Sequence, residues 1–248
     1  MKQLLFIGIV LLSGFSAGVI LGLINFVTTE PFLDSAIELE NRHLFESGEE
    51  KDTPQFRAEY DAYRFWQKSG MVLAGGIFGL AIGSLFGIVF GLSREVLPGK
   101  RHVQKALVLS GLMWFTIFMI PFFKYPANPP TVGDPETVVL RATLYLSFIV
   151  ISGFGAVGFY RLYKRLQRNK KFVAFVGYAI FISIAFALMP SNPDKITAPM
   201  DLVNGFRMMS ALSVSLFWLA NAIILGLLWQ KFQPHIMKDI KRLTDSAQ

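Results

Sequence analysis

The chain has 248 residues, of which 53% are hydrophobic, and it contains no cysteine. The lack of cysteine excludes a disulfide framework, a thiolate metal site and a dithiol redox centre. The net charge is +7, which we attribute to basic cytoplasmic loops of a membrane protein rather than to nucleic-acid binding.

Six apolar runs are long enough to cross a bilayer, because about 20 apolar residues in a helix span its hydrocarbon core. The predicted spans are Leu4–Val27, Gly70–Leu92, Ala106–Phe123, Val138–Tyr160, Phe172–Met189 and Met208–Leu228. We therefore predict an all-α integral membrane protein whose residues 1–248 form a single membrane domain. The first run is too long for the apolar core of a signal peptide, although cleavage near Ser16-Ala17 would leave five helices.

The charges of the connecting segments predict the orientation. With a cytoplasmic N-terminus, the inner segments carry 15 of the 24 Lys and Arg but only three of the 17 acids. This bias predicts cytoplasmic N- and C-termini in a multi-pass protein of the cytoplasmic membrane. The basic stretch 161–171 suits the anionic headgroups of the surrounding lipid bilayer.

Residues 28–69 are predicted to form a helical extracytoplasmic insertion between the first two spans. Its residues 31–47 have the pattern of an amphipathic helix, with Glu40 on the apolar face and His43 three residues later. Carboxylate and imidazole groups are ligands for Co²⁺ and similar ions. We therefore expect Glu40 and His43, with Glu30 as a third ligand, to form a cation site.

The alternative for this insertion is structural. Glu40 would then form an ion pair with an arginine, for which Arg64 and Arg141 are the candidates, and His43 would be a surface residue.

Glycines four residues apart line one face of each of the first two spans, which favours close helix packing, with a surface that slides or contacts a partner subunit as the alternative. They are Gly14, Gly18 and Gly22, and Gly75, Gly79, Gly83, Gly87 and Gly91. Asn25 and Asn221 are interior polar residues that we expect to form hydrogen bonds between helices, with pore lining as the alternative.

The loop between the third and fourth spans is rich in proline and reads PFFKYPANPPTVGDPETVVLRATLY. Asp134 and Pro135 predict a helix start, and Glu136 suits the positive end of that helix. Asp134 and Glu136 are also candidate ion ligands at a membrane mouth. Arg141 lies within the next span, where we expect it to bind carbonyl groups that Pro126, Pro129 and Pro130 leave without helical partners.

This loop is where the chain resembles a known family. The segment KYPANPPTVGDPET, followed by Arg141 and Tyr145, resembles the signature of the CbtA family of predicted cobalt transporter subunits. Glu30-Pro31, Arg64 and Gln67 before the glycine-rich second span extend the likeness. The resemblance implies a role in moving Co²⁺, with the loop Pro121–Tyr145, which includes Asn128 and Arg141, shaping the external mouth. It also implies a small, histidine-containing companion membrane subunit (CbtB-like).

The loop has a short internal echo. Ala127-Asn128-Pro129, Pro135 and Arg141 are matched by Ser191-Asn192-Pro193, Pro199 and Arg207. The chain therefore suggests three in–out–in helical hairpins, each returning with an arginine near its outer edge, as internal repeats do in transporters.

No catalytic constellation or nucleotide-binding motif is present in the sequence, so we predict neither an enzyme nor a bound cofactor. The predicted function is a subunit of a cobalt transporter, with Co²⁺ as the transported ion. Two alternatives stay open. One is a membrane scaffold or assembly subunit that does not transport, and the other is a membrane enzyme or sensor that acts on lipids.

Overall fold

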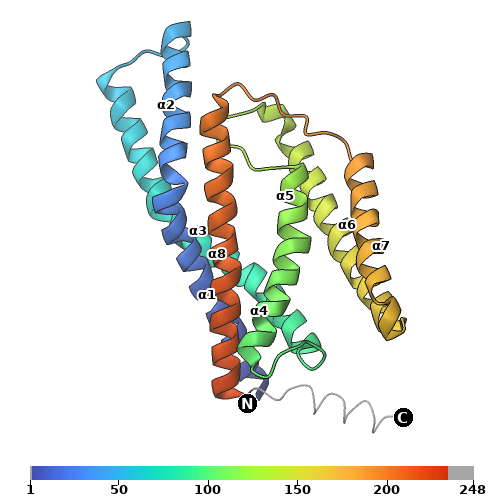
Figure 1. Ribbon diagram of the computed structural model, residues 1–248. Coiled ribbons are helices and arrows are strands. Elements are labelled where there is room, and N and C mark those ends of the chain that lie inside the picture. Colours follow the sequence, from blue (N-terminus) through green and yellow to red (C-terminus); the bar gives the residue numbers. More distant parts are fainter. Residues whose placement is uncertain (1, 234–248) are drawn as a thin grey trace. The chain divides into compact units, whose positions relative to one another are not determined.

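The computed structural model describes residues 2–233, of which 83% belong to helices, and no strand occurs in that range (Figure 1). Six helices are long and apolar enough to cross a membrane, which confirms the predicted class. The elements in chain order are α1 (Lys2–Thr28), α2 (Glu30–Ser47), α3 (Pro54–Ser93), α4 (His102–Met113), η1 (Trp114–Met119), α5 (Ile120–Lys124), η2 (Pro135–Thr137), α6 (Val138–Arg165), η3 (Arg168–Lys170), α7 (Phe172–Leu188) and α8 (Met200–Phe232). The C-terminal part of the predicted cytoplasmic tail lies outside the described residues.

The contacts divide the chain into two compact units, and the single membrane domain stays a prediction. Unit 1 comprises Met1–Gly111 and Met208–Gln248, and unit 2 comprises Leu112–Arg207. Each unit contains one of the two polar clusters described below.

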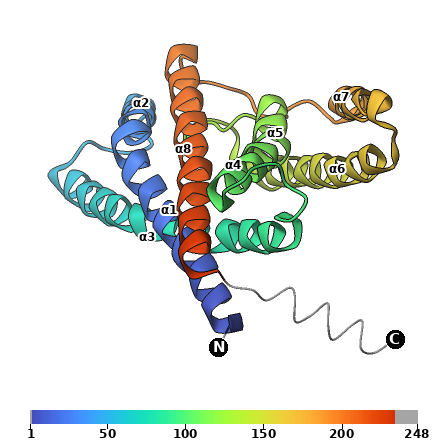
Figure 2. The same ribbon diagram turned by 60° about the horizontal axis from the view of Figure 1, so that its bottom comes forward.

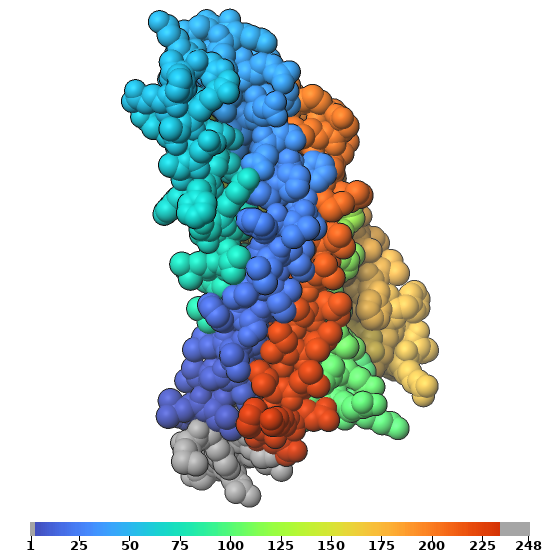
Figure 3. All heavy atoms as spheres, turned by 90° about the vertical axis from the view of Figure 1, so that its left-hand side faces the viewer, coloured from blue at the N-terminus to red at the C-terminus, as the bar shows by residue number. Residues whose placement is uncertain are grey.

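In unit 1, α1, α2 and α3 form one long helical hairpin. Only Thr29 separates α1 from α2, and Pro31 follows at once with no N–H to donate to the preceding turn. The hairpin turns at residues 48–53, where Gly48 adopts a positive φ of 77° and Thr53 caps α3 by accepting a hydrogen bond from the backbone N–H of Phe56. Figure 3 shows α2 and the first part of α3 lying together at one end of this unit.

The length of α3 decides where the charged part of this hairpin lies. Its 40 residues make a helix of about 60 Å, whereas the hydrocarbon core of a bilayer is about 30 Å thick. The polar first part of α3 therefore extends beyond the membrane with α2. This is the helical insertion that the sequence predicted, and we call it the stalk (residues 30–69).

The glycines of α1 and α3 lie against each other where the two helices cross (Figure 2). A Cβ atom on Gly18 would overlap the carbonyl oxygen of Gly75, and one on Gly79 would overlap that of Gly14. The backbones therefore touch, and the predicted close packing is confirmed. Helix α8 packs on α3 with aromatic side chains, including a T-shaped contact between Phe90 and Trp229.

Unit 2 begins in the third span, which changes from α- to π-helix at η1. The widened turn precedes Pro121, which cannot donate the hydrogen bond that a regular helix requires there. Helix α6 then packs against α5 on one side and α7 on the other. Its contact with α7 includes a hydrogen bond of 2.8 Å between the hydroxyls of Ser152 and Tyr178.

Candidate functional site

The first polar cluster lies where α1 meets α2, and we call it the junction cluster: Glu30, Asp34, Arg64, Gln67 and Lys68. The guanidinium of Arg64, on α3, donates hydrogen bonds to Glu30 and, at 2.7 Å, to Asp34. It also donates to the amide oxygen of Gln67 at 2.7 Å. The ammonium of Lys68 lies 2.9 Å from Oδ2 of Asp34 and 3.8 Å from Oε1 of Glu30.

Burial differs sharply within the junction cluster. The side chains of Glu30 and Arg64 are 5% and 7% exposed, whereas those of Asp34 and Lys68 are 45% and 32% exposed. Burial opposes ionisation of Asp34, but the hydrogen bonds from Lys68 and Arg64 together outweigh it and lower the pKa of this carboxyl. One oxygen of Glu30, Oε2, is buried and has no hydrogen-bond partner in the described part of the chain. The cluster is therefore anchored at Arg64 and open to solvent at Lys68.

The three predicted metal ligands do not come together. Glu40 and His43 are both exposed on α2, and Glu30 lies ten residues before Glu40, which is about 15 Å along a helix. Within residues 2–233, no group of three or more His, Asp or Glu side chains is placed to hold a metal ion. Arg64 forms ion pairs with Glu30 and Asp34, and Arg141 forms one with Asp194. Among the described residues, neither arginine pairs with Glu40. The pair of Glu40 and His43 stays a prediction.

The second polar cluster, which we call the loop clamp, consists of Asn128, Arg141, Asp194 and Arg207. The carboxylate of Asp194 is fully buried and accepts hydrogen bonds of 2.6 Å from both Arg141 and Asn128. Arg207 donates to the amide oxygen of Asn128 at 2.7 Å and to the carbonyl oxygen of Ala127 at 3.3 Å. The clamp thus binds the loop before α6 to the loop before α8.

Two further contacts position Asp194. Its other oxygen accepts a hydrogen bond of 3.0 Å from the backbone N–H of Asp134, and a Cβ atom on Gly133 would overlap the carboxylate. Gly133 also has a φ of 109°, a conformation that glycine adopts without strain. Glycine is therefore required at this position on both counts.

The predicted helix start is confirmed. The side chain of Asp134 accepts a hydrogen bond of 2.9 Å from the backbone N–H of Glu136, and Pro135 opens η2, which runs directly into α6. Both acidic side chains are exposed. Arg141 anchors the loop through Asp194 and not through the carbonyl groups that we expected it to bind. The carbonyl group of Ala127 is bound by Arg207 instead.

The prolines of the loop are buried to different degrees. Pro129 is fully buried, Pro126 is half-buried and Pro130 is exposed. The hydroxyl of Tyr125 donates a hydrogen bond of 2.6 Å to the carbonyl oxygen of Pro190. The prolines therefore stiffen a loop that a tyrosine and two arginines hold in place.

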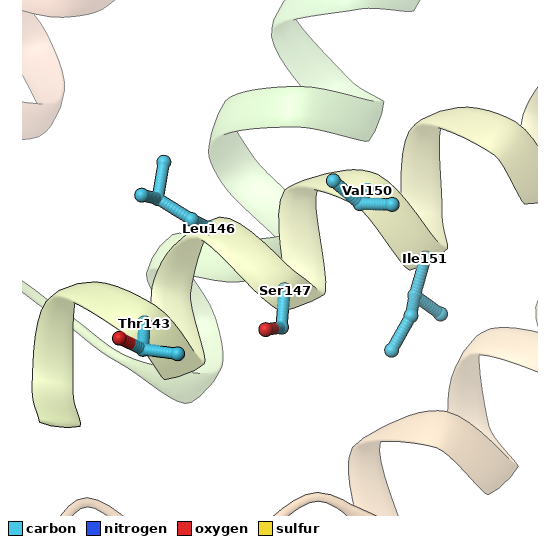
Figure 4. A pocket seen from close by; sticks show the side chains of 5 residues that line it. All are labelled: Thr143, Leu146, Ser147, Val150 and Ile151. Carbon is cyan, nitrogen blue, oxygen red and sulfur yellow. The ribbon is translucent and has the colours of Figure 1, made fainter.

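A shallow groove lies on one face of α6 and is lined by Thr143, Leu146, Ser147, Val150 and Ile151 (Figure 4). Its volume is about 400 Å³. The lining offers no charged group and no histidine, so it is not a metal site.

A family model described as "Probable cobalt transporter subunit (CbtA)" matches residues 1–230, which include the stalk, both polar clusters and all six spans. The chain belongs to the CbtA family. No curated protein and no solved structure matches it. This CbtA chain is thus a multi-pass membrane protein of a family of probable cobalt transporter subunits.

Sequence reasoning missed two acidic residues of this CbtA chain, Asp34 and Asp194. Asp194 is the single acid between Glu136 and Asp201, and it stands thirteen residues before Arg207, as Asn128 stands thirteen before Arg141. Each arginine binds the polar residue of the other pair: Arg141 binds Asp194, and Arg207 binds Asn128. The shared spacing was therefore a signal that could have predicted the loop clamp. Asp34 lies one helical turn after Glu30 and so reaches the same arginine.

Proposed function

We propose that this chain is the membrane subunit through which a divalent transition-metal cation, Co²⁺ in the first place, moves inward across the cytoplasmic membrane. The single observation that carries the proposal is the family match over residues 1–230. The six apolar helices are consistent with a protein that conducts an ion rather than one that only binds it at a surface.

In this proposal the stalk stands on the extracytoplasmic side, where it gathers cations. Residues 28–69 carry ten Asp and Glu against five Lys and Arg. Such an excess of negative charge raises the local concentration of cations through its field. The exposed Glu40 and His43 would add a first weak contact with the ion, since a carboxylate and an imidazole suit Co²⁺.

We also propose that the chain works with a separate small, histidine-containing membrane subunit. The family description names a subunit, which implies further subunits. The chain itself contains three histidines, which are far apart in the sequence. A companion would supply the imidazole ligands that a selective path for Co²⁺ requires.

The test is uptake of radiolabelled Co²⁺ by a transport-deficient host that expresses the chain alone or with its candidate companion. Uptake that depends on the chain supports the proposal, and uptake absent from every pairing, with the protein inserted in the membrane, overturns it. Glu40→Gln and His43→Ala test the stalk contact. Glu46→Gln, an exposed acid on the same helix, is the matched control.

One observation favours a second candidate, a membrane scaffold that assembles other subunits without transporting. Over the described range 2–233, no metal-binding group of three or more His, Asp or Glu is present. The scaffold is the better explanation if the companion takes up Co²⁺ without this chain and the chain raises the uptake rate only by increasing the companion's abundance.

A further inference from the structure

The ammonium group of Lys68 occupies a position between two carboxylates at the base of the stalk. We propose that Glu30 and Asp34 form a binding site for a hydrated divalent cation, and that Lys68 fills the cation position until the metal ion displaces it. The inference rests on the proposed function, because it names residues at the base of the stalk that bind the transported ion.

The two cationic side chains of the junction cluster differ in how firmly they are held. Arg64 is buried and bound to Glu30, Asp34 and Gln67, so it is a fixed part of the site. Lys68 is one-third exposed, and its ammonium forms ion pairs with two carboxylates, at 2.9 Å and 3.8 Å. A lysine side chain is flexible and its ammonium is readily hydrated, so Lys68 is the cation that can leave.

An unpartnered buried oxygen points to a ligand. The side chain of Glu30 is 95% buried, yet its Oε2 accepts no hydrogen bond among the described residues, while Oε1 of the same carboxylate faces Arg64 and Lys68. Leaving a buried charged acceptor unsatisfied is unfavourable. A metal ion, or a water molecule of its hydration shell, would satisfy this oxygen.

The charges predict reversible binding. Two carboxylates, Arg64 and Lys68 sum to zero, so exchange of Lys68 for a divalent ion leaves a local charge of +1. Such a site holds the ion weakly, as a binding site on a transport path must do in order to release its ion. Two carboxylates with retained waters suit hydrated Co²⁺, Ni²⁺, Mn²⁺ or Mg²⁺ rather than a soft monovalent ion. The partly exposed Asp34 gives the ion its access from solvent.

The test is equilibrium dialysis of radiolabelled Co²⁺ against the purified full chain in detergent. Lys68→Met removes the competing cation, so we expect the affinity for Co²⁺ to rise about tenfold. Asp34→Asn removes a ligand, so we expect the affinity to fall at least tenfold. Lys68→Arg retains the competing charge and should keep the affinity near that of the parent. Glu38→Gln, one turn further along α2 and paired with Arg42 at the surface, is the matched control.

Two results overturn the site: an affinity that does not rise in Lys68→Met, or one that Asp34→Asn lowers no more than Glu38→Gln does. Circular dichroism and gel filtration of each variant separate loss of binding from loss of fold. If cellular Co²⁺ uptake requires the chain but the variants leave the affinity for Co²⁺ unchanged, the site fails and the proposed function stands. If Lys68→Met binds Co²⁺ more tightly and no pairing supports uptake, the site stands and the proposed function fails.

Discussion

Arg141 donates a hydrogen bond of 2.6 Å to Asp194, which lies 53 residues later in the chain. The carboxylate of Asp194 is fully buried. Its ion pair with Arg141 and its hydrogen bond from Asn128 hold together two loops that are separated in the sequence by the hairpin of α6 and α7. Removal of one partner would leave a buried charge without compensation.

Asp194→Asn should therefore destabilise the protein by about 3–5 kcal/mol, the range for breaking one side of a buried pair. Thermal unfolding of the purified protein measures this. Asp201→Asn, an exposed acid in the first turn of α8, is the control and should have little effect. The double variant Arg141→Met with Asp194→Leu should lose less stability than the single variants Arg141→Met and Asp194→Leu lose together. A loss of stability equal to the sum of these two would contradict the pair.

Asn221 is predicted to cost stability. It is fully buried in α8 beside Gly83, and neither its amide oxygen nor its amide nitrogen has a hydrogen-bond partner within residues 2–233. Asn221→Leu, whose side chain branches at the same atom but carries no polar group, should raise the stability by about 1 kcal/mol because an unsatisfied amide is removed. A lower melting temperature in this variant would mean that the amide is bonded in the native protein.

The crossing of α1 and α3 should tolerate no side chain at Gly18. Its added Cβ would overlap the backbone of Gly75, so Gly18→Ala should cost about 1–3 kcal/mol or prevent the helices from packing. Gly8→Ala on the same helix is the control, since no atom of the described residues lies within 4 Å of a Cβ atom added there. Equal melting temperatures for the two variants would exclude the backbone contact.

The docking of α2 on α3 should weaken in acid. The pKa of Asp34 in the folded protein lies below its ordinary value of 3.8, so its bonds with Lys68 and Arg64 stabilise the fold fully above that value. This contribution is lost as the pH falls through the lowered pKa of the folded state. Limited proteolysis of the stalk between pH 6 and pH 2 measures it, and the acid-induced increase in cleavage should shrink in Asp34→Asn.

The sequence by itself determined the membrane class, the six spans, the helical stalk, the helix start at Asp134 and the glycine contact between the first two spans. Each of these depends on local properties: length of an apolar run, periodicity, a capping residue and its proline. The family could also be read from the loop before α6, because its prolines and polar residues are contiguous in the chain.

The tertiary structure alone decided which charges meet. Arg64 was one candidate partner of Glu40 and instead binds Glu30 and Asp34, while Arg141 was expected to bind loop carbonyls and instead binds Asp194. Glu40 was placed on an apolar face by periodicity and is exposed. Charged partners on different helices are chosen by helix register and by the paths of the loops, and neither is encoded in local patterns. The sequence therefore determines which segments enter the membrane, and the packing of those segments decides which polar groups face each other.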